Sequence, residues 1–111
     1  MAQDVLVVGE LSDGEISTTT SELLAAAKGL ADGGTVGVTL LGTGADGAAQ
    51  GAFNAGATKA FVGADAGYDK FSSDQWVAAV EAAMEQLSPA VVLLAQSPAG
   101  RDLGPRLAFR H

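Results

Sequence analysis

The sequence predicts a single α/β domain in which a parallel sheet lies between two layers of helices. Two observations support this class: short apolar runs end in glycine or other small residues, and longer segments with helical spacing separate those runs. Four such strand-then-helix units fit within the 111 residues, which is enough chain for one hydrophobic core. Right-handed crossovers then give a parallel sheet with the strand order 3-2-1-4.

The first unit occupies the first 34 residues. Residues 5–8 are uniformly apolar, as expected for a strand buried on both faces, and a polar stretch with the turn dipeptide Asp13-Gly14 follows. Thr19 and Glu22 have capping-box spacing and predict the start of a helix. The apolar stripe of this helix is predicted to consist of Leu23, Ala27 and Leu30, and its end to lie at Gly33-Gly34.

The next units follow the same order. A strand is predicted over residues 36–41, an alanine-rich helix over 45–55 ending at Gly56, and a brief strand over 60–63. Ser72 and Gln75 again have capping-box spacing. The helix that they open has its predicted buried face at Val77, Val80, Met84 and Leu87. Pro89 separates that helix from a fourth strand over residues 90–95.

Composition excludes several classes of function. Six Lys and Arg against 13 Asp and Glu give a formal net charge of −7, which disfavours nucleic acid and anionic membranes as partners. The absence of Cys excludes disulfides and a thiol nucleophile, and it fits a reducing compartment. The apolar runs are too short to cross a bilayer, and the first residues do not resemble a signal peptide. We therefore expect a soluble, cytoplasmic protein.

Catalytic and metal-binding constellations are sparse. The only histidine is the terminal His111, and Ser97 lacks the flanking glycines of a nucleophile elbow. Asp65 and Asp69 fall on a polar loop, where we expect them to be solvated. The aromatic residues near the third helix are better explained as a cover over the core than as a base-stacking platform; they are Tyr68, Phe71 and Trp76. We predict no catalytic residue and no metal site.

A glycine motif and an acidic loop are candidate nucleotide sites. Gly42, Gly44 and Gly47 form G-x-G-x-x-G between a strand and a helix, and Asp65 stands where a ribose-binding acid would belong. Asp46 in the first helical turn would repel a pyrophosphate, so a plain tight turn is the favoured interpretation. The loop over residues 9–16 follows the central strand, and its charged side chains are all acidic, which favours contact with protein, or simple solvation, over phosphate binding.

The closing segment, residues 97–111, holds three of the six basic side chains. It follows the fourth strand, at the sheet edge where open α/β sheets bind ligands. Ser97, Gly100, Arg101 and Asp102 are therefore weak candidates for cofactor binding. Arg101, Pro105 and Arg106 are candidates for contact with a partner or another domain, because an arginine offers a planar fork to a carboxylate or phosphate. The alternative is a surface cluster of ion pairs contributing little.

The spacing G-R-D-x-x-P-R over residues 100–106 resembles the signature of the alpha subunit of electron transfer flavoproteins. The segments at residues 4–17, 20–31, 35–44, 52–65 and 91–110 are also similar to the amino-terminal domain of that subunit. The resemblance covers essentially the whole chain, residues 1–111, and its most specific part is the closing segment. It implies an adenine-nucleotide-hydrolase-like fold that is truncated after the fourth strand and part of the next helix.

The resemblance also implies a function. In that family this domain is a scaffold: a larger domain, absent from this sequence, holds FAD, and a beta subunit of related fold forms the heterodimer and carries AMP. The complex takes electrons from dehydrogenases and passes them to an acceptor. Ser97, Gly100, Arg101, Asp102, Pro105 and Arg106 match the motif and are expected to shape the sheet edge that faces the partner. No cofactor is expected on this chain itself.

Two alternatives stay open, together with an expectation about assembly. The chain could be a stand-alone domain binding AMP or ATP at the switch point of the sheet, or a dinucleotide-dependent enzyme using the glycine motif and Asp65. A sheet that stops after its fourth strand exposes one more edge, so we expect some self-association, which sedimentation analysis would detect.

Overall fold

The computed structural model describes residues 2–69, 72–95, 97, 100–101 and 103–105. Its main sheet contains four parallel strands in the order β5 (Lys59–Gly63), β4 (Val36–Leu41), β1 (Val5–Val8) and β6 (Val91–Leu93). In chain order these are the third, second, first and fourth strands of the sheet, so the predicted order 3-2-1-4 is confirmed. Val5 of the central strand pairs with Val36 on one side and Val91 on the other.

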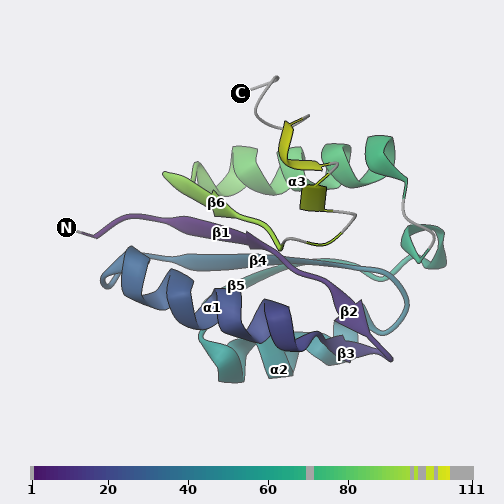
Figure 1. Cartoon of the computed structure of the whole chain (residues 1–111), viewed down its shortest axis with the longest axis horizontal. Helices are drawn as coiled ribbons and strands as arrows, with labels where there is room; N and C mark the ends of the chain where they lie inside the picture. Colours follow the sequence, from purple (N-terminus) through teal and green to yellow (C-terminus); the bar gives the residue numbers. More distant parts are fainter. Residues whose placement is uncertain (1, 70–71, 96, 98–99, 102, 106–111) are drawn as a thin grey trace.

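Helices cover both faces of the sheet (Figure 1). Helices α1 (Thr18–Ala31) and α2 (Ala45–Ala55) lie on one face, and α3 (Ser73–Leu87) lies on the other. None of the helices within the described ranges is long and apolar enough to span a membrane.

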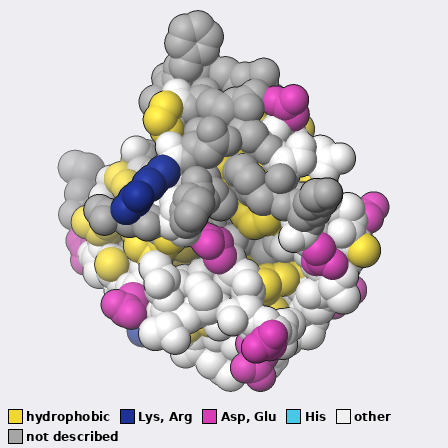
Figure 2. Space-filling model, turned by 45° about the vertical axis from the view of Figure 1, so that its right-hand side comes forward, with side chains coloured by type: hydrophobic (Ala, Val, Ile, Leu, Met, Phe, Trp, Pro, Cys, Tyr) yellow, Lys and Arg dark blue, Asp and Glu magenta, His cyan; other side chains and the backbone are white. Residues whose placement is uncertain are grey.

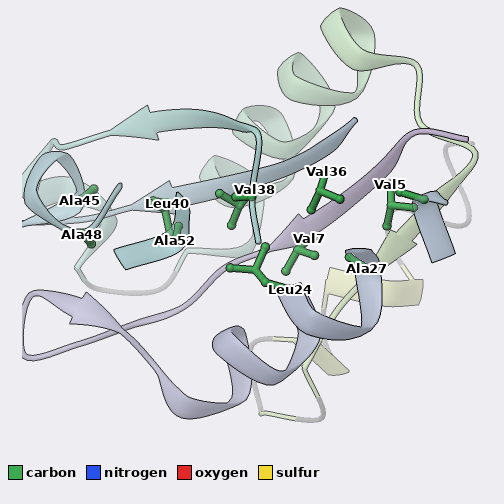
Figure 3. Close-up of a cluster of buried hydrophobic side chains, with 12 residues drawn as sticks. Val5, Val7, Leu24, Ala27, Val36, Val38, Leu40, Ala45, Ala48 and Ala52 are labelled. Carbon is green, nitrogen blue, oxygen red and sulfur yellow. The ribbon is translucent and has the colours of Figure 1, made fainter. Parts of the chain in front are cut away.

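Strand β1 divides the interior into two hydrophobic clusters. Val5 and Val7 pack with Leu24 and Ala27 of α1 on one face (Figure 3), whereas Leu6 belongs to the cluster on the α3 face. All four residues of the strand are at most 3% exposed. Because successive side chains in a strand point to opposite faces, a strand covered on both sides must be apolar throughout. This explains the uninterrupted run that predicted it.

The two glycine-bounded elements in the middle of the chain were predicted most accurately. The observed bounds of β4 and α2 coincide with the predicted ranges. Strand β5 begins one residue earlier than predicted, at Lys59, and β6 is shorter than the predicted range of 90–95.

The start and the buried stripe of α1 correct the prediction. Ser17, and not Thr19, is the N-cap: its hydroxyl accepts a hydrogen bond from the Thr20 amide at 3.1 Å. This earlier start rotates the helix so that the buried positions are Thr20, Leu24, Ala27 and Ala31. Leu30, expected on the buried stripe, is 44% exposed. The helix ends at Ala31, and Asp32 caps it in the left-handed region before Gly33.

Helix α3 confirms most of its predicted face. Val77, Val80 and Leu87 are buried, but Ala83 replaces Met84 as the fully buried position between them. Ser72 occupies the N-cap position of α3, but its side chain makes no capping hydrogen bond with the described residues. The Ser72 hydroxyl therefore does not form the predicted capping box.

A short β-hairpin was not predicted. Strands β2 (Leu11–Ser12) and β3 (Glu15–Ile16) pair antiparallel around Asp13 and Gly14, whose φ angles are 54° and 80°. Two central residues with positive φ are the requirement of a type I′ turn, so the predicted turn at this dipeptide is confirmed. The strands were missed because two-residue strands are too short to show an alternating pattern.

We predict opposite effects of the same substitution at two buried threonines. The Thr39 hydroxyl is buried and has no hydrogen-bond partner within the described part of the chain. Thr39→Val should therefore raise the free energy of unfolding by about 1 kcal/mol, because a buried unsatisfied hydroxyl is removed without loss of volume. Urea unfolding followed by circular dichroism measures this change.

Thr20→Val is the matched control. The Thr20 hydroxyl accepts the Glu10 amide at 2.9 Å and bonds the Glu10 carbonyl at 3.2 Å. Its removal should lower the free energy of unfolding by roughly 1–3 kcal/mol, since a part-buried amide loses its acceptor. Equal destabilisation by both variants would contradict the assignment of Thr39 as an unsatisfied group.

Candidate functional site

The carboxyl ends of β1 and β4 open into a cavity of about 520 Å³, which we call the carboxyl-edge cavity. The β2–β3 hairpin, the turn before α2 and the short helix η1 (Ala66–Tyr68) surround it. Its walls are formed by Glu10, Leu11, Asp13, Gly14, Leu41, Thr43, Gly44, Tyr68, Asp69 and Trp76. Figure 2 views the molecule from the side of these strand ends and shows acidic side chains with hydrophobic side chains exposed between them.

The switch point of the sheet, between β1 and β6, is closed by a hydrogen-bond relay. The Ser97 hydroxyl donates to the Glu10 carboxylate at 2.7 Å and accepts the Gly100 amide at 3.0 Å. The main chain of Glu10 is itself fixed by the Thr20 hydroxyl. Ser97 therefore connects the loop after the first strand to the closing segment, 87 residues away.

Gly100 is required by a close approach of backbone. A Cβ atom at this position would lie 1.9 Å from the Ala95 carbonyl oxygen, so no other residue fits without movement of the chain. The neighbour that requires glycine at this position is therefore the protein's own main chain. The Arg101 amide donates to the Ser97 carbonyl at 2.9 Å, and the Arg101 side chain is exposed.

Of the other candidate residues in the closing motif, the structure describes Pro105, which is exposed. Asp102 and Arg106 lie outside the described residues, as do Phe71 and His111, so their predicted roles stay predictions.

The glycine motif is occupied by a carboxylate of the chain itself. The Thr43 amide donates to Asp69 Oδ1 at 2.7 Å, and the Thr43 hydroxyl donates to Asp69 Oδ2 at 2.6 Å. A Cβ on Gly42 would lie 2.7 Å from Asp69 Oδ1, and one on Gly44 would lie 2.9 Å from the Gly14 Cα. Contacts with Asp69 and with the hairpin therefore account for these two glycines without a pyrophosphate. Gly47 has open space around its Cα.

Asp65 and Asp69 have separate structural tasks. Asp65 is the N-cap of η1 and accepts the Gly67 amide at 2.8 Å, so its carboxylate is used at the start of that helix. Asp69 is exposed, as predicted for a solvated carboxylate, but it also joins η1 to the turn before α2. The hydrogen bonds from the side chain and the amide of Thr43 lower the pKa of Asp69.

Two aromatic side chains form one wall of the cavity. Trp76 is 7% exposed, and its indole Nε1–H donates to the Tyr68 carbonyl at 3.3 Å. Tyr68 is half-buried and packs against the hydrophobic cluster on the α3 face. The predicted cover over the core is confirmed for these two residues.

The chemistry of this edge is acidic and aromatic. Glu10, Asp13 and Asp69 line the carboxyl-edge cavity, and no lysine or arginine is among its described lining residues. In the described ranges, no group of three acidic or histidine side chains is arranged to hold a metal ion. Amides that could bind a phosphate at Thr43 and Gly100 already donate to Asp69 and Ser97. The edge therefore disfavours an anionic ligand.

Comparison with known proteins gives a consistent result. A family model described as the electron transfer flavoprotein domain matches residues 5–110. The chain is 31% identical over 110 residues to the electron transfer flavoprotein subunit alpha of Bacillus subtilis (strain 168), covering 99% of this chain and 34% of that protein. It is 35% identical over 107 residues to the electron transfer flavoprotein subunit alpha of Mycobacterium leprae (strain TN), covering 96% and 33%. The chain thus spans about one third of the length of these curated relatives.

We predict that the low pKa of Asp69 depends on the Thr43 hydroxyl. Because the native pKa lies below the ordinary value of about 3.9, this contact stabilises the protein above that pH and is lost as the pH falls through the native pKa. Thr43→Val should move the Asp69 midpoint upward, which a titration of its carboxyl carbon by NMR would show. Thr43→Ser keeps the donor and should keep the low midpoint; an unchanged midpoint in the valine variant would contradict the cause.

Proposed function

Because the chain belongs to the electron transfer flavoprotein domain family, we propose that residues 1–111 form the amino-terminal α/β domain of an alpha-type subunit. Its function is that of a scaffold and subunit-interaction domain in an FAD-containing complex that carries electrons from dehydrogenases to an acceptor. The match over residues 5–110, with relatives named as alpha subunits, is the observation that carries this proposal. In this role the domain is an electron-carrier component and catalyses no reaction of its own.

The cofactor of such a complex does not fit the described residues of this chain. FAD brings a pyrophosphate, which needs free amides or cations, whereas the Thr43 amide already donates to Asp69 and the Gly100 amide already donates to Ser97. We therefore propose that FAD is held by another domain of the complete subunit, and AMP by the beta subunit. This domain contributes a surface for assembly.

The proposed contact surface includes the exposed side chains of Arg101 and Pro105, with Arg106 next to them in sequence. The Ser97 relay and the tight approach at Gly100 fix the backbone from which Arg101 projects. A preorganised position of this kind lowers the conformational cost of a charged contact with a partner subunit.

The test is complex formation with the electron transfer flavoprotein beta subunit from the same genome. Co-expression followed by native mass spectrometry should show a heterodimer of the two chains. Arg101→Glu should weaken the complex about tenfold, as expected for an interface arginine whose charge is reversed. Lys28→Glu, a charge reversal on the exposed side of α1, is the matched control and should change little. Failure of the unaltered chain to bind the subunit would contradict the proposal.

The alternative function, a stand-alone domain binding AMP or ATP, has one observation in its favour: the sheet order places a switch point between β1 and β6. The Glu10 carboxylate at that point argues against it. We predict no thermal stabilisation by either nucleotide. Ligand at 100 times its dissociation constant would stabilise a binding protein by about 2.7 kcal/mol, so a clear rise in melting temperature would favour the alternative.

A further inference from the structure

We propose that the outer edge of β5 pairs antiparallel with the same edge of a second copy of this chain, which joins the two four-stranded sheets into one. The inference is independent of the proposed complex with a beta subunit. It concerns the edge opposite to β6, the fourth strand, where the sequence predicted self-association. Three properties of the β5 edge support it: its free main chain, its exposed apolar side chains and its self-complementary charge.

The main-chain groups on the outer side of β5 are unpaired. The Gly63 carbonyl accepts the Gly42 amide at 2.8 Å, so it points toward β4. Because successive peptide groups in a strand alternate in direction, the N–H and C=O groups of Ala60 and Val62 point away from β4. None of the described residues forms a hydrogen bond with these groups. An unpaired row of this kind is a template for another strand.

Apolar side chains are exposed along the same edge, on the face that α2 covers. Val62 is 40% exposed and Phe53 of α2 is 43% exposed. Val62 follows Ala60 by two residues and therefore shares its face, and Ala60 packs against the cluster beneath α2. Gly51 of α2 faces Ile16 of the hairpin. Phe53 lies about 200° around the helix from Gly51, so its ring is on the flank away from the hairpin.

The helix layer leaves room for a second copy. Helix α2 lies over β4 and β5, whereas α1 lies over β1 and β4, so α2 is the outermost described helix at this edge. Two β5 strands paired at the usual spacing of about 4.8 Å would bring the two α2 helices to about 10 Å from each other. This is an ordinary distance for packed helices. Pairing would therefore cover exposed apolar surface of the helix layer as well as the strand edge.

Charge and side-chain size select one register. When Val62 pairs with Val62 of the second copy, Lys59 lies opposite Asp65 of that copy. In the same register Phe61 lies opposite Gly63, which has no side chain to obstruct the ring. A pairing centred on Phe61 would instead place Lys59 opposite Gly63 and leave the lysine without a charge partner. The twofold axis of such a dimer forms each of these contacts twice.

Both charged groups are available for this contact. The Lys59 ammonium lies 5.4 Å from the centroid of the Phe61 ring and forms no ion pair with the described residues. Asp65 continues the extended line of β5, with φ −66° and ψ 130°. Its Oδ1 accepts the Gly67 amide, and its Oδ2 has no partner among the described residues. A lysine on an edge strand ordinarily discourages pairing, but opposite a carboxylate it favours one partner and one register.

The test begins with the unaltered 111-residue chain. Sedimentation equilibrium over a concentration series should show a monomer–dimer equilibrium. Hydrogen exchange measured by NMR over the same series should show that protection of the Val62 amide rises with the dimer fraction, while the amides of β6 do not change. A chain that stays monomeric up to about 1 mM would overturn the proposal. Protection that appears at β6 and not at Val62 would overturn it as well.

Charge reversal tests the register. Lys59→Glu should weaken self-association about tenfold, because both exposed pairs become repulsive. Lys28→Glu, the same change on the exposed side of α1, is the matched control and should have no effect. Asp65→Lys should also weaken self-association, and an equimolar mixture of the Lys59→Glu and Asp65→Lys variants should form a heterodimer, since opposite charges then face each other at both pairs.

Asp65 also caps η1, so circular dichroism must first show that the Asp65→Lys variant is folded. With both variants folded, absence of the heterodimer would overturn the proposal. Equal self-association of the Lys59→Glu and Lys28→Glu variants would overturn it whether or not the Asp65 variant folds.

Discussion

The burial of β1 on both faces is the constraint on which the rest of the structure depends. A strand with at most 3% exposure at every residue requires helices above and below the sheet and a parallel neighbour on each side. The chain must therefore leave β1 at the carboxyl edge, where a Cβ on Gly9 would lie 2.6 Å from the Thr39 carbonyl oxygen. Glu10 follows directly, so packing in the core places the first acidic side chain at the switch point.

The sequence predicted elements whose signals are local and failed where the signal was distant or ambiguous. Strand β4 and helix α2 were predicted with the observed bounds because glycines mark their ends. The start of α1 was misplaced because Ser17 and Thr19 are both good caps, and only the burial of Thr20 against the Glu10 main chain selects the first. The Asp69 contact with Thr43 spans 26 residues and the Ser97 contact with Glu10 spans 87, so no local pattern could indicate either.

The two glycine-containing turns at the carboxyl edge show how a fold suited to phosphate can exclude it. A carboxylate resembles a phosphate in charge and in the hydrogen bonds that it accepts, so a backbone amide is satisfied by either. Here Asp69 accepts the amide of Thr43, and Ser97, itself bonded to Glu10, accepts the amide of Gly100. The glycines remain necessary because the chain's own atoms approach closely, which is why the motif alone could not distinguish a nucleotide site from an internally closed turn.

Closing these turns from within also changes what the surface can recognise. The Asp69 carboxylate, which takes the place of a phosphate at the Thr43 amide, adds a negative charge to an edge that Glu10 and Asp13 also line. A nucleotide domain attracts an anion with free amides, whereas the amides of Thr43 and Gly100 already have acceptors within this chain. The same topology can therefore present turns that are closed to phosphate, and the change requires only that an internal carboxylate or hydroxyl reaches each amide first.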